Sequence, residues 1–168
     1  MKATLKLFLI IVVAAFYSCE KKADNEEVKT YIDKLISGDY VAFKMPAFTP
    51  DDIPALLEYR DAASIITSFP RNPVSSYFQH ECRLGVYILW TVESIRKVEN
   101  GSYDLILRFP SQNSVIALRE THDFEPVTNE QSHRELSRAY YEWWYSSSSS
   151  ITDKMKSDPL EGTKYIWH

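Results

Sequence analysis

The stretch LGVYILWTVESIRKV, residues 84–98, decides the fold of this 168-residue chain. Its apolar side chains recur at helical spacing on one face, and further apolar groups such as Trp90 lie elsewhere around the cylinder. The main stripe comprises Leu84, Tyr87, Ile88, Thr91, Val92 and Ile95. Because a helix that is apolar on several sides needs neighbours on more than one face, this segment predicts a central helix. Gly85 would let one neighbour approach closely, and Asn100-Gly101 would end the helix.

Two helices are expected before this segment. The first is amphipathic, with Asp24 or Asn25 as its N-cap and Gly38 just after its end. Its apolar stripe comprises Val28, Tyr31, Ile32, Leu35 and Ile36. The second is short, with Thr49 as its N-cap and Pro50 in its first turn. The first is predicted to dock through this stripe, and the second has its apolar face at Ile53, Leu56 and Leu57.

Two capping-box pairs predict further helix starts, one at Ser76 with Gln79 and one at Thr128 with Gln131. The helix after Thr128 is long, and its stripe comprises Leu136, Ala139, Tyr140, Trp143 and Ser147. The aromatic run at 164–168 is expected to dock on the body of the protein.

Residues 103–118 allow two interpretations. Alternating apolar residues followed by a second apolar run would suit a hairpin across 111–114, whereas Ser111 could instead cap a helix. A helix is preferred. Residues 28–168 are therefore expected to form a single, mainly α domain of several packed helices, with an α+β fold holding a minor hairpin near 103–118 as the alternative.

The N-terminus carries an export signal. Lys2 and Lys6 precede the uncharged run LFLIIVVAAF, which is too short to span a bilayer but suits a cleavable signal over residues 1–18. The motif Phe16-Tyr17-Ser18-Cys19 resembles a bacterial lipobox and departs from it in its two bulky aromatics. Cys19 is thus predicted to carry lipid, and residues 19–27 to form a polar tether.

The charge balance of the chain argues against two kinds of binding surface. The chain has 19 basic and 23 acidic residues, and loss of Lys2 and Lys6 with the signal leaves a net charge of −6. With no basic block, this balance argues against nucleic-acid binding and against a polybasic membrane patch.

Catalytic signatures are scarce. The chain has no HExxH, no GxSxG, no phosphate-binding glycine loop and no cofactor motif. If Cys19 is lipidated, Cys82 is the only remaining thiol, and we interpret it as a buried small hydrophobe. A metal or hydrolase site would need His80, Cys82, His122 and His133 to meet in the fold. No catalytic, cofactor-binding or metal residue is assigned.

The long C-terminal helix carries a second aromatic face. Tyr141 and Tyr145 point away from the apolar stripe, with Trp144 at their flank. These rings either pack under another element or form an exposed platform for a sugar or a partner.

Four runs carry a family resemblance: FTPDDIPALLEYR, FPRNPVSSY, LGVYILWTVESIR and EGTKYIWH. They resemble an uncharacterised family of Bacteroides lipoproteins of about this length, a domain of unknown function. The resemblance covers nearly the whole mature chain. It implies a Gram-negative envelope setting and no assigned activity, so it transfers no functional residue.

Three functions follow as expectations. The first is a non-enzymatic envelope lipoprotein that has no cofactor and binds a partner protein. It would be anchored at the outer membrane, on either its periplasmic or its surface face. The second is a carbohydrate-binding or glycan-handling lipoprotein that uses Tyr141, Trp144 and Tyr145. The third is a hydrolase around His80 and Cys82.

Overall fold

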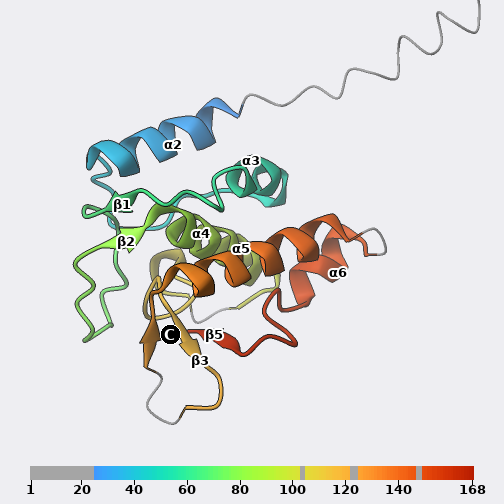
Figure 1. Cartoon of the computed structure of the whole chain (residues 1–168). Helices are drawn as coiled ribbons and strands as arrows, with labels where there is room; N and C mark the ends of the chain where they lie inside the picture. The colour runs from blue at the N-terminus through green and yellow to red at the C-terminus, as the bar shows by residue number, and fades with distance from the viewer. Residues whose placement is uncertain (1–24, 103–104, 122–124, 147–148) are drawn as a thin grey trace, which may run out of the picture.

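The computed structural model describes residues 25–102, 105–121, 125–146 and 149–168. These ranges form a mainly helical fold with two small antiparallel sheets (Figure 1). The α-helices are α2 (Glu26–Ser37), α3 (Ile53–Leu57), α4 (Leu84–Glu99), α5 (Glu130–Tyr145) and α6 (Ile151–Lys156), with 3-10 turns η1 (Pro50–Asp52) and η2 (Ile106–Arg108). The strands are β1 (Ile65–Ile66), β2 (Cys82–Arg83), β3 (Ile116–Leu118), β4 (Pro126–Val127) and β5 (Tyr165–Trp167).

The central position predicted for residues 84–98 is confirmed. Helix α4 contacts α3, α5, α6 and β2, and most of its side chains are buried, including the large rings of Tyr87 and Trp90. In Figure 1, α4 lies between the α2–α3 layer and α5. The apolar groups on several sides of α4 thus each have a neighbouring element.

Gly85 permits the closest of these contacts. A Cβ atom at this position would lie 2.5 Å from Nε2 of His133 and would also overlap the carbonyl of Arg60. Nε2 of His133 in turn lies 2.8 Å from the carbonyl oxygen of Arg60. The absence of a side chain at Gly85 therefore lets α5 and the turn after α3 meet over the start of α4.

The predicted ends of α2 and the start of the next helical segment are confirmed. The Asn25 side chain accepts a hydrogen bond from the backbone N–H of Val28, and Gly38 adopts the left-handed conformation after the helix, with φ of 80°. Asp52 accepts hydrogen bonds from the backbone N–H and the hydroxyl of Thr49, which completes a capping box around Pro50. The other candidate cap of α2, residue 24, lies outside the described residues.

The predicted helix start at Ser76 is wrong. Residues 76–81 follow an irregular path that leads into β2, and the helix begins at Leu84. Arg71 explains this path, because its Nε donates to the carbonyl of Gln79 over 2.8 Å and so holds the segment outside a helix. The cap of α5 is also displaced by one residue: Asn129, rather than Thr128, accepts from the backbone N–H of Ser132.

The preference for a helix over residues 103–118 is also wrong, and so is a local hairpin. Strand β3 pairs with β4 on one side and with β5 on the other, in the order β4-β3-β5. Ile116 lies opposite both Val127 and Trp167. Both partners follow β3 in the chain, and β5 is distant from it in sequence, which local periodicity does not reveal. Docking of the C-terminal run is confirmed, because it supplies β5; residues 103, 104 and 147 lie outside the described ranges.

A buried ionic cluster connects α4, α5, α6 and β5. Both carboxylate oxygens of Glu93 accept from the guanidinium of Arg96, at 2.8 and 2.6 Å. Arg96 also donates to the carbonyl of Ser157, the phenol of Tyr140 donates to Glu93, and the indole of Trp167 donates to Tyr140. Burial raises the pKa of Tyr140 well above its ordinary value, and the charge of Glu93 adds to this shift. The phenol therefore stays protonated and keeps donating to the carboxylate.

Candidate functional site

A cleft of about 430 Å³ lies between the β1–β2 pair, strand β3 and the beginning of α5. The apolar part of its wall is formed by Ile65, Ile116 and Val127, and the polar part includes Arg83 and Ser132. This volume falls in the range of roughly 300 to 1,000 Å³ that is usual for ligand pockets. The cleft is therefore large enough to hold a small molecule or a few side chains of another polypeptide.

One rim of the cleft is a loop held by stacked rings. The guanidinium of Arg71 lies 4.5 Å from the ring centroid of Phe69 and 4.9 Å from that of Phe78. Phe78 is nevertheless 63% exposed, and its ring meets that of His80 edge to face at 4.7 Å. Tyr77 beside it is also exposed. The loop thus presents aromatic side chains at the mouth of the cleft on a backbone that Arg71 fixes.

Gln79 joins this loop to the opposite wall. Its side-chain oxygen accepts from the hydroxyl of Ser114 at 3.0 Å, and its amide donates to the carbonyl of Glu81 at 3.2 Å. Sequence reasoning missed this rim because it assigned Gln79 to a capping box. The adjacent aromatic pair, Tyr77 and Phe78, within a proline-bounded loop was the available signal.

Cys82 borders the cleft but is buried. Its thiol donates to the carbonyl of Ser114 over 3.4 Å, and burial raises its pKa to about 12. A thiol in this state is a poor nucleophile at neutral pH, because the thiolate is the reactive form. The arrangement favours the interpretation of Cys82 as a small buried hydrophobe.

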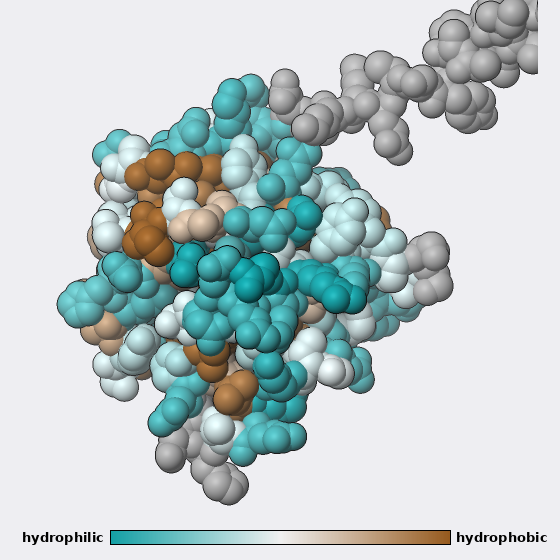
Figure 2. Space-filling model, viewed as in Figure 1, coloured by the Kyte–Doolittle hydropathy of each residue, from teal (hydrophilic) through white to brown (hydrophobic). Residues whose placement is uncertain are grey.

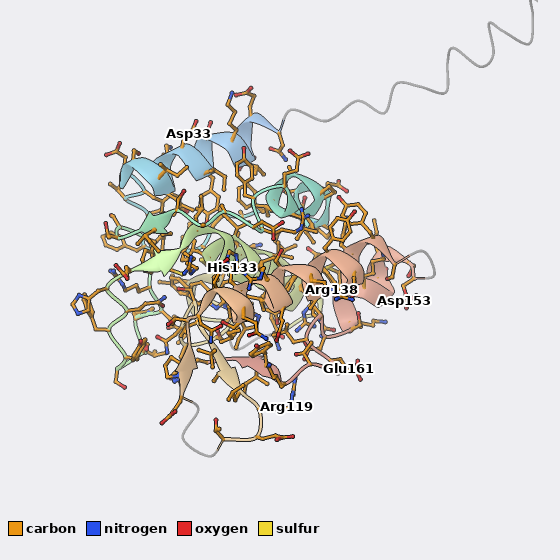
Figure 3. The ribbon with its side chains drawn as sticks, in the orientation of Figure 1. Asp33, Arg119, His133, Arg138, Asp153 and Glu161 are labelled. Carbon is orange, nitrogen blue, oxygen red and sulfur yellow. The ribbon has the colours of Figure 1, made fainter. Side chains whose placement is uncertain are left out.

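His133 also borders the cleft, at the beginning of α5, where Figure 3 labels it. Its ring is buried, and Nε2 is committed to the carbonyl of Arg60. His80, on the rim, is exposed. The structure thus brings His80, Cys82 and His133 to one cleft, but His122 lies outside the described residues. Within the described ranges, no group of three or more His, Cys, Asp or Glu side chains is arranged to hold a metal ion.

The aromatic face of α5, defined by Tyr141, Trp144 and Tyr145, is separate from the lining of the cleft. The ring centroids of Tyr141 and Tyr145 lie 4.6 Å apart, and the two residues are 43% and 51% exposed. The guanidinium of Arg60 covers the Tyr141 ring at 4.6 Å. Partial burial raises the pKa of Tyr145, and neighbouring Tyr141 adds to the shift. The rings therefore stack under Arg60 and still reach the surface.

Trp144 occupies the flank of this face. Its ring is half-buried, lies 5.6 Å from that of Trp143 and is covered by the amine of Lys154 from α6 at 5.5 Å. Trp144 therefore connects α5 to α6 and offers less open ring surface than Tyr141 or Tyr145.

These features define a small, mainly α domain with a mixed polar and apolar cleft and an exposed aromatic face. The chain belongs to the family described as a domain of unknown function, DUF4943, whose model matches residues 22–168. No curated protein and no solved structure matches the chain. In the described part of the chain, no helix combines the length and apolarity needed to cross a bilayer.

Proposed function

We propose that the mature protein is a lipid-anchored protein of a Bacteroides-type cell envelope that binds a partner protein without catalysing a reaction. The anchor rests on the sequence of residues 1–19, with its basic head, short apolar run and cysteine. The family match supports this division, because it begins at residue 22, just beyond Cys19. Residues 1–24 lie outside the described structure, so the anchor is argued from sequence alone.

The anchor is tested by the intact mass of the protein taken from its native membrane. Wild type should begin at Cys19 and carry added acyl mass, and Cys19→Ala should lose both this mass and its membrane association. An unmodified, freely soluble wild-type protein would contradict the anchor and leave a secreted domain.

The binding function rests on one observation, the cleft with exposed aromatic side chains at its mouth. Of the apolar side chains there, Phe78, Tyr77 and Ile65 are all solvent-exposed. Figure 2 shows hydrophobic surface over α2 and, beside it, over β1, and the exposed side chains there include Ile36 and Ile65. The apolar rim thus continues beyond the cleft, and exposed apolar patches commonly mark protein-binding surfaces.

The backbone of the rim favours a polypeptide partner over a small ligand. Among the residues that the structure describes, the N–H groups of Phe78, His80 and Glu81 have no hydrogen-bond partner. An extended segment of a partner can supply main-chain acceptors to such groups while its side chains enter pockets. The cleft would then accept one or two side chains of that segment.

A photo-crosslinking amino acid at Tyr77 tests this assignment in the native envelope. A discrete adduct should form at position 77, should disappear when Phe78→Asp is added, and should be absent when the same probe replaces exposed Ile151 on α6. Equal adducts at positions 77 and 151, or an adduct at 77 that is insensitive to Phe78→Asp, would show that the cleft is not the partner-binding site. Thermal unfolding checks that Phe78→Asp leaves the fold intact.

A second candidate function is carbohydrate binding on the aromatic face of α5, because Tyr141 and Tyr145 retain exposed ring surface. Titration with envelope oligosaccharides by calorimetry should show saturable heat that Tyr145→Ala abolishes and Tyr77→Ala retains. Absence of heat in wild type, or equal loss in both variants, would rule out this surface.

A further inference from the structure

Four exposed apolar side chains gather on two adjacent loops and are used neither by the cleft nor by the aromatic face of α5. Val41 and Phe43, which follow α2, are 85% and 88% exposed, and Ile106 and Leu107 of η2 are exposed as well. We call these four residues the apolar loop patch. Contiguous exposed apolar patches tend to mark sites of protein or membrane interaction.

The two loops are fixed to each other by one backbone hydrogen bond and one hydrogen bond from a side chain. The N–H of Met45 donates to the carbonyl of Leu107 at 3.1 Å, and the guanidinium of Arg108 donates to the carbonyl of Phe48 at 3.0 Å. The hydroxyl of Ser94 on α4 donates to the carbonyl of Arg108. The patch is therefore presented on a backbone tied to the central helix.

The same segment carries backbone strain. Leu107 and Arg108 have φ of 52° and 68°, a left-handed conformation that side chains other than glycine rarely adopt. Nε of Arg108 is buried without a hydrogen-bond partner in the described part of the chain. Strain of this kind persists where surrounding contacts impose it, and it concentrates at functional segments. Here it accompanies an exposed leucine.

The loop that carries Val41 and Phe43 follows α2 and belongs to a segment that contacts this helix along its length. The Tyr40 and Phe48 rings both pack on Tyr31 of α2, with centroids 5.2 and 5.3 Å away. The Asn25 side chain then donates to Asp52, so residues 40–52 run back beside α2 to its beginning. Six residues from Cys19 to Asn25 span at most roughly 20 Å. The domain is thus held near the bilayer, with the apolar loops beside the helix that follows the tether.

We propose that the apolar loop patch inserts into the interface of the bilayer to which Cys19 anchors the chain, so that the domain has a fixed orientation on the membrane. This inference rests on the lipid anchor proposed above. Phe43 and its apolar neighbours would enter the boundary between headgroups and acyl chains, while the exposed Lys44 would meet headgroup phosphates. Because the mature chain carries a net charge of −6, apolar burial rather than charge attraction drives the contact.

The test places an environment-sensitive fluorophore on the lipidated protein in vesicles of phosphatidylethanolamine and phosphatidylglycerol. The label is attached at Phe43→Cys, and the control label at Glu161→Cys, which Figure 3 shows on the opposite side of the molecule from α2. Buried Cys82 stays unlabelled because its pKa is raised. The label at 43 should shift to the blue and be quenched by nitroxide lipids, whereas the label at 161 should respond only to soluble iodide.

A second variant separates insertion from mere proximity. With the label at Ile106→Cys, the double substitution Val41→Asp and Phe43→Asp should abolish the blue shift, and Ile151→Asp should preserve it. Each large side chain contributes about tenfold to the inserted population, so loss of both should be about a hundredfold. The substituted positions, 41, 43, 106, 151 and 161, are all exposed, and thermal unfolding verifies that each variant retains the fold.

Each contrary outcome is distinct. An acylated protein whose label at 43 remains accessible to iodide would overturn the patch and leave the anchor intact. A native protein without acyl mass would overturn the anchor itself. A blue shift that grows with protein concentration in lipid-free Cys19→Ala protein would assign the patch to contact between two copies and contradict membrane insertion.

Discussion

Substitution of Glu93 by glutamine should destabilise the protein more than any comparable exchange at its surface. Glu93 and Arg96 are almost wholly buried and share two charge-assisted hydrogen bonds. Glu93→Gln preserves size but leaves the guanidinium without its counter-charge and turns an amide donor toward it. Removal of one partner from a buried ion pair costs about 3 to 5 kcal/mol. The stability of a domain is about 5 to 15 kcal/mol, so this loss is a large fraction of the total.

Urea unfolding followed by tryptophan fluorescence measures this loss as a lower midpoint at unchanged slope. The matched control is Glu142→Gln, whose partner Arg138 lies 2.7 Å away in an exposed pair on α5. This control should change stability by at most about 0.5 kcal/mol. Exchange of both buried partners, Glu93→Leu with Arg96→Met, should cost less than the sum of the single changes. If Glu93→Gln costs no more than Glu142→Gln, the buried cluster does not stabilise the fold as argued.

Three further outcomes are expected. Gly85→Ala should lower stability by about 1 to 3 kcal/mol in urea unfolding, because its Cβ would overlap His133; a gain from helix propensity alone would contradict the close contact. Cys82 should resist iodoacetamide in the folded protein at pH 8 and react after unfolding, since burial raises its pKa to about 12; rapid labelling of the folded state would refute this. A hydrogen bond from the Tyr165 phenol, together with those from neighbouring groups, lowers the pKa of Glu135 from 4.5 to about 2. The stability advantage of wild type over Glu135→Gln should therefore be full above pH 4.5 and vanish as pH falls through about 2. An advantage that does not depend on pH would contradict this prediction.

The helical part of the fold follows from local rules that can be applied to the sequence. The stripe over residues 84–98 and the caps at Asn25, Gly38 and Thr49 each depend on residues within a few positions of one another. Gly85 was also identified from sequence as a site of close approach. The chain alone did not identify Arg60 and His133 as the groups that approach it, because they belong to distant segments.

The candidate cleft was largely hidden from sequence analysis. His80, Cys82 and His133 were selected as chemically notable residues, and the structure places all three around the cleft. Its rim depends on the stacking of Arg71 between two aromatic rings, and its wall depends on β3, which pairs with the C-terminal strand β5 as well as with β4. Neither feature has a periodic pattern.

The sequence by itself determined the mainly helical class, the central helix and the expectation of a lipid anchor at Cys19, because periodicity, capping and export signals are local properties. Only the tertiary structure decided that residues 116–118 are a strand between β4 and β5, that Glu93 and Arg96 form a buried cluster with Tyr140, and that two loops share an exposed apolar patch. The β3–β5 pairing, the contact of Tyr140 with Glu93 and the joining of the two loops are contacts between segments far apart in the chain, where the free energy of burial and pairing overrides local preference.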